Sequence, residues 1–110
     1  MPVNKRRGEV AAMIDGRERR LCLTLGALAE LEDAFAVEDI AALASRFGTG
    51  RLSARDLTRI LGAGLRGAGE TIDDAEVARL PFDGGAAGAA SVAVALLEAA
   101  FGSGEATARP

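Results

Sequence analysis

The sequence predicts a small α+β domain, with an N-terminal two-stranded antiparallel β-hairpin followed by a compact bundle of four to five short α-helices. Three observations support this fold class. A tight Asp15-Gly16 turn separates two strand-like segments, helix-capping residues recur along the rest of the chain, and small side chains dominate the apolar residues. Hydrophobic residues make up 49% of the chain, yet it contains only four Phe and no Tyr or Trp. Much of the apolar content is alanine, which favours closely packed helices.

The length of 110 residues fits one domain with a modest core. We expect this domain to span residues 1–102, with the hairpin at 8–25 and the helices at 25–101. Residues 103–110 are small and polar, so we expect them to form a disordered tail.

The hairpin is predicted from its turn and its return strand. Asp-Gly suits a type I′ turn, which needs positive φ at both central residues, and Gly16 can adopt it without a Cβ clash. The return strand alternates leucines with other residues: Leu21, Leu23 and Leu25 with Arg20, Cys22 and Thr24. Such alternation indicates a half-buried strand. We interpret Cys22 as a small buried or half-buried hydrophobe, with a reactive thiol as the alternative.

Four short helices are predicted after the hairpin, at about residues 25–35, 37–47, 53–67 and 73–80. Three of them begin with a hydrophobic staple, in which apolar residues flank a capping residue. These staples are Leu23-Thr24 with Leu28, Leu52-Ser53 with Leu57, and Ile72-Asp73 with Val77. Asp56 and Glu76 complete capping boxes with Ser53 and Asp73.

A last helix is predicted at about residues 86–101, and it is apolar almost all round. Only Gly88, Ser91 and Glu98 interrupt a surface of Ala, Val, Leu and Phe. A helix of this kind is buried centrally or against a partner, and complete internal burial is difficult in so small a domain.

The composition excludes most catalytic machinery. The chain has no His and one Cys, so ordinary His/Cys metal sites, Ser-His triads and internal disulfides are not expected. We therefore predict no enzyme activity, no catalytic or metal-binding residues and no cofactor. No uncharged apolar run reaches the length of a membrane span, and no signal peptide is recognised, so a cytoplasmic location is expected.

Two motifs suggest chemistry that their context does not support. Residues 62–67 match the Gly-x-Gly-x-x-Gly pattern of dinucleotide-binding loops, but they fall late in an amphipathic helix, where close packing and capping explain glycines. The acidic pairs Glu38-Asp39 and Asp73-Asp74 are interpreted as responses to helix dipoles, with divalent-cation binding as the alternative.

The N-terminal region is basic, whereas the whole chain has a net charge of −3. Arg17, Arg19 and Arg20 would form a basic edge of the hairpin. Charged side chains protect exposed strands from pairing, so a solvated edge is one interpretation. The alternative is a small regulator that binds nucleic acid, for which salt-sensitive DNA binding should disappear when these arginines are replaced. The basic segment lacks aromatic residues for base stacking, which argues against that alternative.

Several segments of the chain, in this order, resemble a family of small proteins from phage-like gene transfer agents. They are residues 7–10 (RGEV), 14–16 (IDG), 21–32 (LCLTLGALAELE), 60–69 (ILGAGLRGAG) and 96–101 (LLEAAF). The resemblance covers about residues 4–102. Its members belong to tail gene clusters of siphophage-like, prophage-derived particles and are sometimes labelled tail tube proteins, although their small helical size is closer to that of tail assembly chaperones.

The resemblance implies a tail assembly chaperone that binds the tape measure protein, the tail tube protein or both during virion morphogenesis. Protein–protein interaction through an apolar helix would be its mechanism, with Leu96, Leu97 and Phe101 as partner-binding residues. The alternative for these three residues is the domain core. Arg17, Arg19 and Arg20 are the secondary partner-binding residues. Self-association into a homo-oligomer is left open.

The main alternative function is a structural component of the gene transfer agent tail. Tube-forming subunits usually carry a larger β-sandwich-like sheet, whereas this sequence predicts one hairpin.

Overall fold

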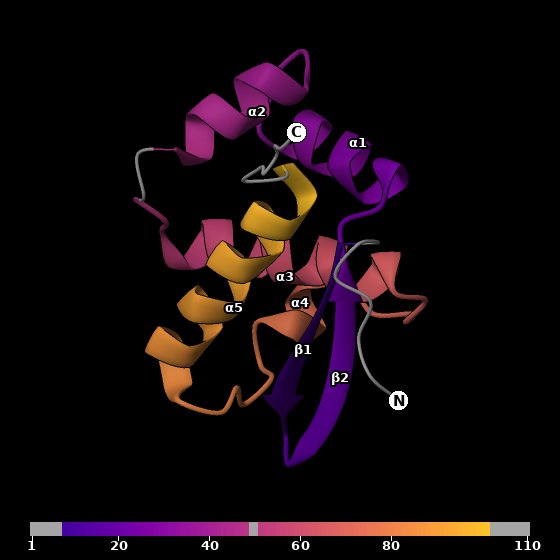
Figure 1. Cartoon of the computed structure of the whole chain (residues 1–110). Helices are drawn as coiled ribbons and strands as arrows, with labels where there is room; N and C mark the ends of the chain where they lie inside the picture. The colour runs from indigo at the N-terminus through magenta and orange to yellow at the C-terminus, as the bar shows by residue number, and fades with distance from the viewer. Residues whose placement is uncertain (1–7, 49–50, 102–110) are drawn as a thin grey trace, which may run out of the picture.

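The computed structural model describes residues 8–48 and 51–101, and these residues form an α+β fold. The elements follow in the order β1 (Glu9–Ile14), β2 (Arg17–Cys22), α1 (Leu25–Ala34), α2 (Ile40–Phe47), α3 (Ala54–Gly67), α4 (Asp74–Val77) and α5 (Gly85–Phe101). Figure 1 shows α3 crossing the middle of the molecule behind α5, with α1 and α2 at one end and the hairpin pointing toward the other. The predicted fold class is confirmed. The predicted tail at 103–110 lies outside the described residues.

The hairpin turns where the sequence predicts. Asp15 and Gly16 have φ angles of 55° and 77°, as a type I′ turn requires. The strands are antiparallel, with Ile14 opposite Arg17 and Val10 opposite Leu21. Ile14 and Leu21 are fully buried, so this face of the ribbon contributes to the core.

The free edge of β1 is joined to the segment between α4 and α5. The Asp15 N–H donates to the Pro81 carbonyl at 2.9 Å, and the Asp83 N–H donates to the Met13 carbonyl at 3.0 Å. Ile14 also forms an isolated antiparallel bridge with Phe82. These bonds attach the segment that precedes α5 to the turn end of the hairpin.

Helix α3 is the centre of the core, because β2, α1, α4 and α5 all pack against it. Its residues Ile60, Leu61 and Leu65 are almost completely buried. They belong to one core cluster with large buried side chains from β2, α1, α2 and α5, namely Leu21, Leu31, Leu43 and Leu96.

The helix starts agree with the capping residues in the sequence. Thr24, Ser53 and Asp73 are N-caps with extended backbone, and the side chain of each accepts a hydrogen bond from the N–H three residues later. Both predicted capping boxes, Ser53 with Asp56 and Asp73 with Glu76, are present. Caps of this kind contribute about 1 kcal/mol each.

Two predicted helices are longer than the observed ones. The second begins at Ile40 rather than Val37, because Asp39 is an extended N-cap that accepts from the Ala42 N–H at 2.8 Å. The fourth spans only Asp74–Val77 rather than reaching Leu80. After Val77 the N–H groups of Arg79 and Leu80 donate to carbonyls three residues earlier, so the chain continues in tight turns. Pro81 then prevents Leu80 from extending a helix, since the residue before a proline is disfavoured in the α conformation.

The prediction that Leu25 continues the apolar face of the strand is wrong. Strand β2 ends at Cys22, and Leu25 is the first residue of α1, with 79% of its surface exposed. The cap at Thr24 redirects the chain before the strand alternation can continue. Leu21 and Leu23, in contrast, are buried as predicted, and so is Cys22.

Helix α1 ends in a Schellman motif that uses alanine where glycine is usual. The Val37 N–H donates to the Glu32 carbonyl at 3.0 Å and the Ala36 N–H to the Asp33 carbonyl at 3.2 Å. Ala36 therefore has a φ of 55°, a conformation that costs a residue with a Cβ about 1–2 kcal/mol.

We expect Ala36→Gly to stabilise the protein by about 0.5–1 kcal/mol. Glycine adopts the left-handed conformation without strain, although the greater flexibility of the unfolded chain with glycine offsets part of the gain. Urea denaturation measures the change. An unaltered or lower free energy of unfolding would show that Ala36 is not held in this conformation in solution.

Candidate partner-binding surface

Helix α5 is apolar on its buried side and almost uncharged on its exposed side. Glu98 is the one charged residue among its 17 residues. Ala89, Ala93, Leu96 and Leu97 face the core. The opposite side presents Ala87, Ser91, Val94 and Glu98 to solvent, and Val94 is 43% exposed. Val94 is the one large apolar side chain of α5 that is exposed, so a partner surface on this helix would centre on it.

The three predicted anchor residues of this helix occupy different environments. Leu96 is fully buried, with its Cδ1 in the space that a Cβ on Gly64 would need. Leu97 is 8% exposed and Phe101 is half-buried. Leu96 thus lies wholly inside the core, whereas Leu97, which is also part of the core cluster, and Phe101 line a surface groove.

This groove, which we term the α5 C-terminal groove, lies between α2 and the last two turns of α5. It has a volume of about 340 Å³. Its lining is apolar apart from one carboxylate, and it comprises Ala44, Phe47, Gly48, Leu52, Val94, Leu97, Glu98 and Phe101. The volume is at the small end of the range for ligand pockets, roughly 300–1,000 Å³.

One wall of this groove is held in place by aromatic and ionic contacts. The rings of Phe35 and Phe47 meet edge to face with centroids 5.0 Å apart. The Arg46 guanidinium lies over both rings and pairs with Asp56 at 3.3 Å. Asp56 is buried at 6% exposure and also accepts from the Ser53 N–H. Helix α2 is therefore tied both to the end of α1 and to the start of α3.

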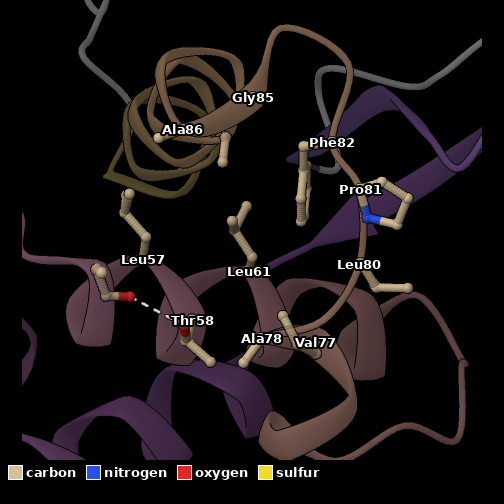
Figure 2. Close-up of a pocket in the computed structure, with 12 residues that line it drawn as sticks. Leu57, Thr58, Leu61, Val77, Ala78, Leu80, Pro81, Phe82, Gly85 and Ala86 are labelled. Atoms are coloured by element: carbon tan, nitrogen blue, oxygen red, sulfur yellow. Dashed lines mark hydrogen bonds between the residues drawn. The ribbon is translucent and has the colours of Figure 1, made fainter.

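A second apolar depression, the α5 N-terminal groove, lies at the other end of α5 and has a volume of about 410 Å³. Figure 2 shows Leu57 and Leu61 rising from α3 toward the start of α5, with Phe82 on one side. Val77 and Leu80 complete its floor and edge. Helix α5 therefore has an apolar depression at each end.

The three predicted basic residues of the hairpin do not share one face. Arg17 and Arg19 lie on the same side of β2 as Leu21, and Arg20 lies on the other, because side chains alternate along a strand. Arg19 pairs with Glu70 at 3.3 Å, and Arg20 lies 3.9 Å from Glu9. These acidic neighbours reduce the positive charge that the ribbon presents to a partner.

The glycine-rich segment at 62–67 lies inside α3 and serves packing. A Cβ on Gly62 would overlap the Asp74 carboxylate, and one on Gly67 would overlap the Cys22 carbonyl oxygen. A Cβ on Gly64 would lie 2.8 Å from Leu96 Cδ1. Ala68 is the C-cap of this helix, and Gly69 follows it with a φ of 105°. The packing interpretation of these glycines is confirmed.

Over residues 8–48 and 51–101, no group of three or more His, Cys, Asp or Glu side chains is placed to hold a metal ion. Within the same residues, no helix has the length and apolar character that crossing a membrane requires.

Nothing in the sequence marks Phe47, Leu52 and Val94 as groove residues. Phe47 ends one predicted helix and Leu52 precedes the cap of the next, so their meeting with Val94 depends on how the helices pack. Glu98 was a usable signal, because a lone charge on an apolar helix marks a side that is not core. Ser91, about two turns before it, marks the same side.

Comparison with known families gives a match over residues 7–103, to the family described as phage tail tube protein, GTA-gp10. Neither a curated protein nor a solved structure matches the chain significantly. The match spans almost the whole domain, including the hairpin and all of α5. The chain therefore belongs to the GTA-gp10 family of phage tail tube proteins.

Proposed function

We propose that this protein is a tail assembly chaperone that acts in the cytoplasm during tail morphogenesis. It would bind the tape measure protein, the tail tube protein or both through the exposed side of α5 around Val94 and the groove beside it. Family membership supports a role in the tail. Helix α5 carries the proposal. Its exposed side has one charged residue, and an apolar groove lies beside each end of the helix.

A chaperone of this kind needs apolar helical surface rather than an extended sheet. In the part of the chain that the structure describes, the sheet has only two strands. Helix-in-groove contacts bury apolar anchors spaced along one helix face, and both grooves offer surface for such anchors. The apolar client would then be shielded from aggregation until the tail assembles around it.

Co-expression with the tape measure protein of the same gene cluster tests this proposal. We expect the native chain to raise the soluble fraction of the tape measure protein severalfold. Val94→Arg should abolish most of that gain, because it places a cation beside apolar groove residues and can pair with Glu98 four residues later.

Met13→Arg is the matched control. Met13 is 46% exposed, close to the 43% of Val94, and lies opposite Glu18 in the ribbon, so the new arginine also gains a carboxylate neighbour. This variant should leave the solubility gain intact. Equal solubility of the tape measure protein with and without the native chain would contradict the proposal.

The second candidate is a structural component of the finished tail, which the description of the family as tail tube protein favours. Quantitative mass spectrometry of purified particles separates the two functions. A chaperone should be depleted in particles relative to the tail tube subunit, whereas a tube component should be present in comparable copy number.

A further inference from the structure

The position of Glu98 on α5 is electrostatically unfavourable in the free protein. Glu98 is exposed and lies in the last turn of the helix, which contains no basic residue. The C-terminal end of a helix carries a partial negative charge, so an acidic residue there is destabilising. The residues three and four positions before it are Ala95 and Val94, which offer no compensating cation.

Among the described residues, Glu98 is the one charged side chain that lines the α5 C-terminal groove. The Arg46 guanidinium, which lies over the ring of Phe47, pairs with Asp56 instead. Within the described part of the chain, no ion pair includes Glu98. The groove therefore combines an apolar floor with one carboxylate and the negative end of a helix, all on the same side of α5.

We propose that the α5 C-terminal groove binds a short amphipathic helix of a partner protein that carries a lysine or arginine beside its apolar stripe. The apolar side chains would contact Val94, Leu97 and Phe101, and the cation would pair with Glu98. This inference rests on the proposed function and specifies the chemistry of the client segment. A helix fits because the groove lies between two helices and two turns of α5 form one wall.

A second copy of this chain fits the groove less well. Helix α5 contains no basic residue, so pairing of two α5 helices would bring no cation to Glu98. A partner cation, in contrast, interacts favourably with both the carboxylate and the helix end. Charge complementarity therefore selects a cationic partner over self-association through α5.

A pair of fluorescein-labelled amphipathic peptides tests this selection. The peptides share one leucine stripe and differ only in a flanking residue, which is Lys in one and Glu in the other. By fluorescence anisotropy with the full chain, we expect the Lys peptide to bind about fivefold more tightly than the Glu peptide. Glu98→Lys should reverse this preference.

Asp33→Lys is the matched control. Asp33 is exposed in the last turn of α1, so its replacement also removes an acid from a helix C-terminus but lies outside the groove lining. It should keep the preference for the Lys peptide. Circular dichroism confirms that each variant is folded.

The proposal is wrong if neither peptide binds, if both bind equally, or if Glu98→Lys leaves the preference unchanged. These outcomes are distinguishable from failure of the chaperone function. A native chain that still solubilises the tape measure protein but shows no peptide preference would retain the function and refute the groove chemistry. A clear peptide preference without any solubility gain would support the groove chemistry and refute the chaperone function.

Discussion

Gly67→Ala is expected to lower the free energy of unfolding by about 3 kcal/mol, although it adds a single methyl group near the end of a helix. A Cβ at this position would overlap the backbone carbonyl oxygen of Cys22 and approach its carbonyl carbon to 3.2 Å. Backbone atoms cannot rotate away as a side chain can, so α3 and β2 would have to separate. That contact is where the hairpin joins the central helix, and its loss would disturb the buried Leu21 nearby.

Gly26→Ala is the matched control for this prediction. Gly26 is also helical, but a Cβ there would meet only the Thr24 Oγ1 at an ordinary 3.8 Å. Alanine should therefore stabilise the protein by up to about 1 kcal/mol through its better helix propensity. Urea denaturation compares both variants with the native chain. Similar stabilities for the two variants would contradict the close approach of α3 to β2.

Arg66→Met is expected to lower the free energy of unfolding by about 2 kcal/mol, because Arg66 links α3 to α1, to α4 and to the loop before α4. Its guanidinium donates to the Ile72 carbonyl at 2.8 Å, to Glu30 of α1 at 3.1 Å and to Asp74 of α4 at 3.1 Å. Glu30 and Asp74 are 44% and 38% exposed, so water screens their share of the effect. The bond to the backbone carbonyl and the lost packing account for much of the rest.

The pKa of Arg66 reflects the same balance. Partial burial lowers it, but hydrogen bonds and charges from Glu30 and Asp74 together outweigh that effect and raise the pKa above its usual value. The guanidinium therefore stays charged wherever the protein is folded.

Two further variants separate geometry from charge at this site. Arg66→Lys should recover only part of the lost stability, because an ammonium cannot reach all three acceptors as a planar guanidinium can. Arg55→Met, at an exposed position on the same helix, should change stability by less than about 0.5 kcal/mol. A full recovery of stability with lysine would show that charge alone matters.

The sequence predicts the parts of this fold that are governed by local chemistry. Asp15-Gly16 specifies the turn, and Thr24, Ser53 and Asp73 specify helix starts, because each acts on backbone groups within a few residues of itself. The conformation that ends α1 was not predictable in this way. Ala36 adopts a positive φ, which closes the Schellman hydrogen bonds, with no glycine to signal it.

The candidate binding surface was only partly predictable, because an apolar helix gives little indication of which side faces the core. Leu96 and Leu97 are adjacent leucines, yet the first is sealed against Gly64 and the second lines a groove. The packing partners that decide this are more than 30 positions away in the sequence. The basic residues Arg19 and Arg20 were likewise grouped by sequence, whereas strand alternation places them on opposite faces of the ribbon.

Affinity purification of this chain from cells that express its whole tail gene cluster tests most directly whether it binds a tail protein through α5. We predict that the tape measure protein or the tail tube protein co-purifies with the native chain and with Met13→Arg, and that Val94→Arg loses it. Recovery of no tail component, or equal recovery with Val94→Arg, would contradict binding through the exposed side of α5 around Val94.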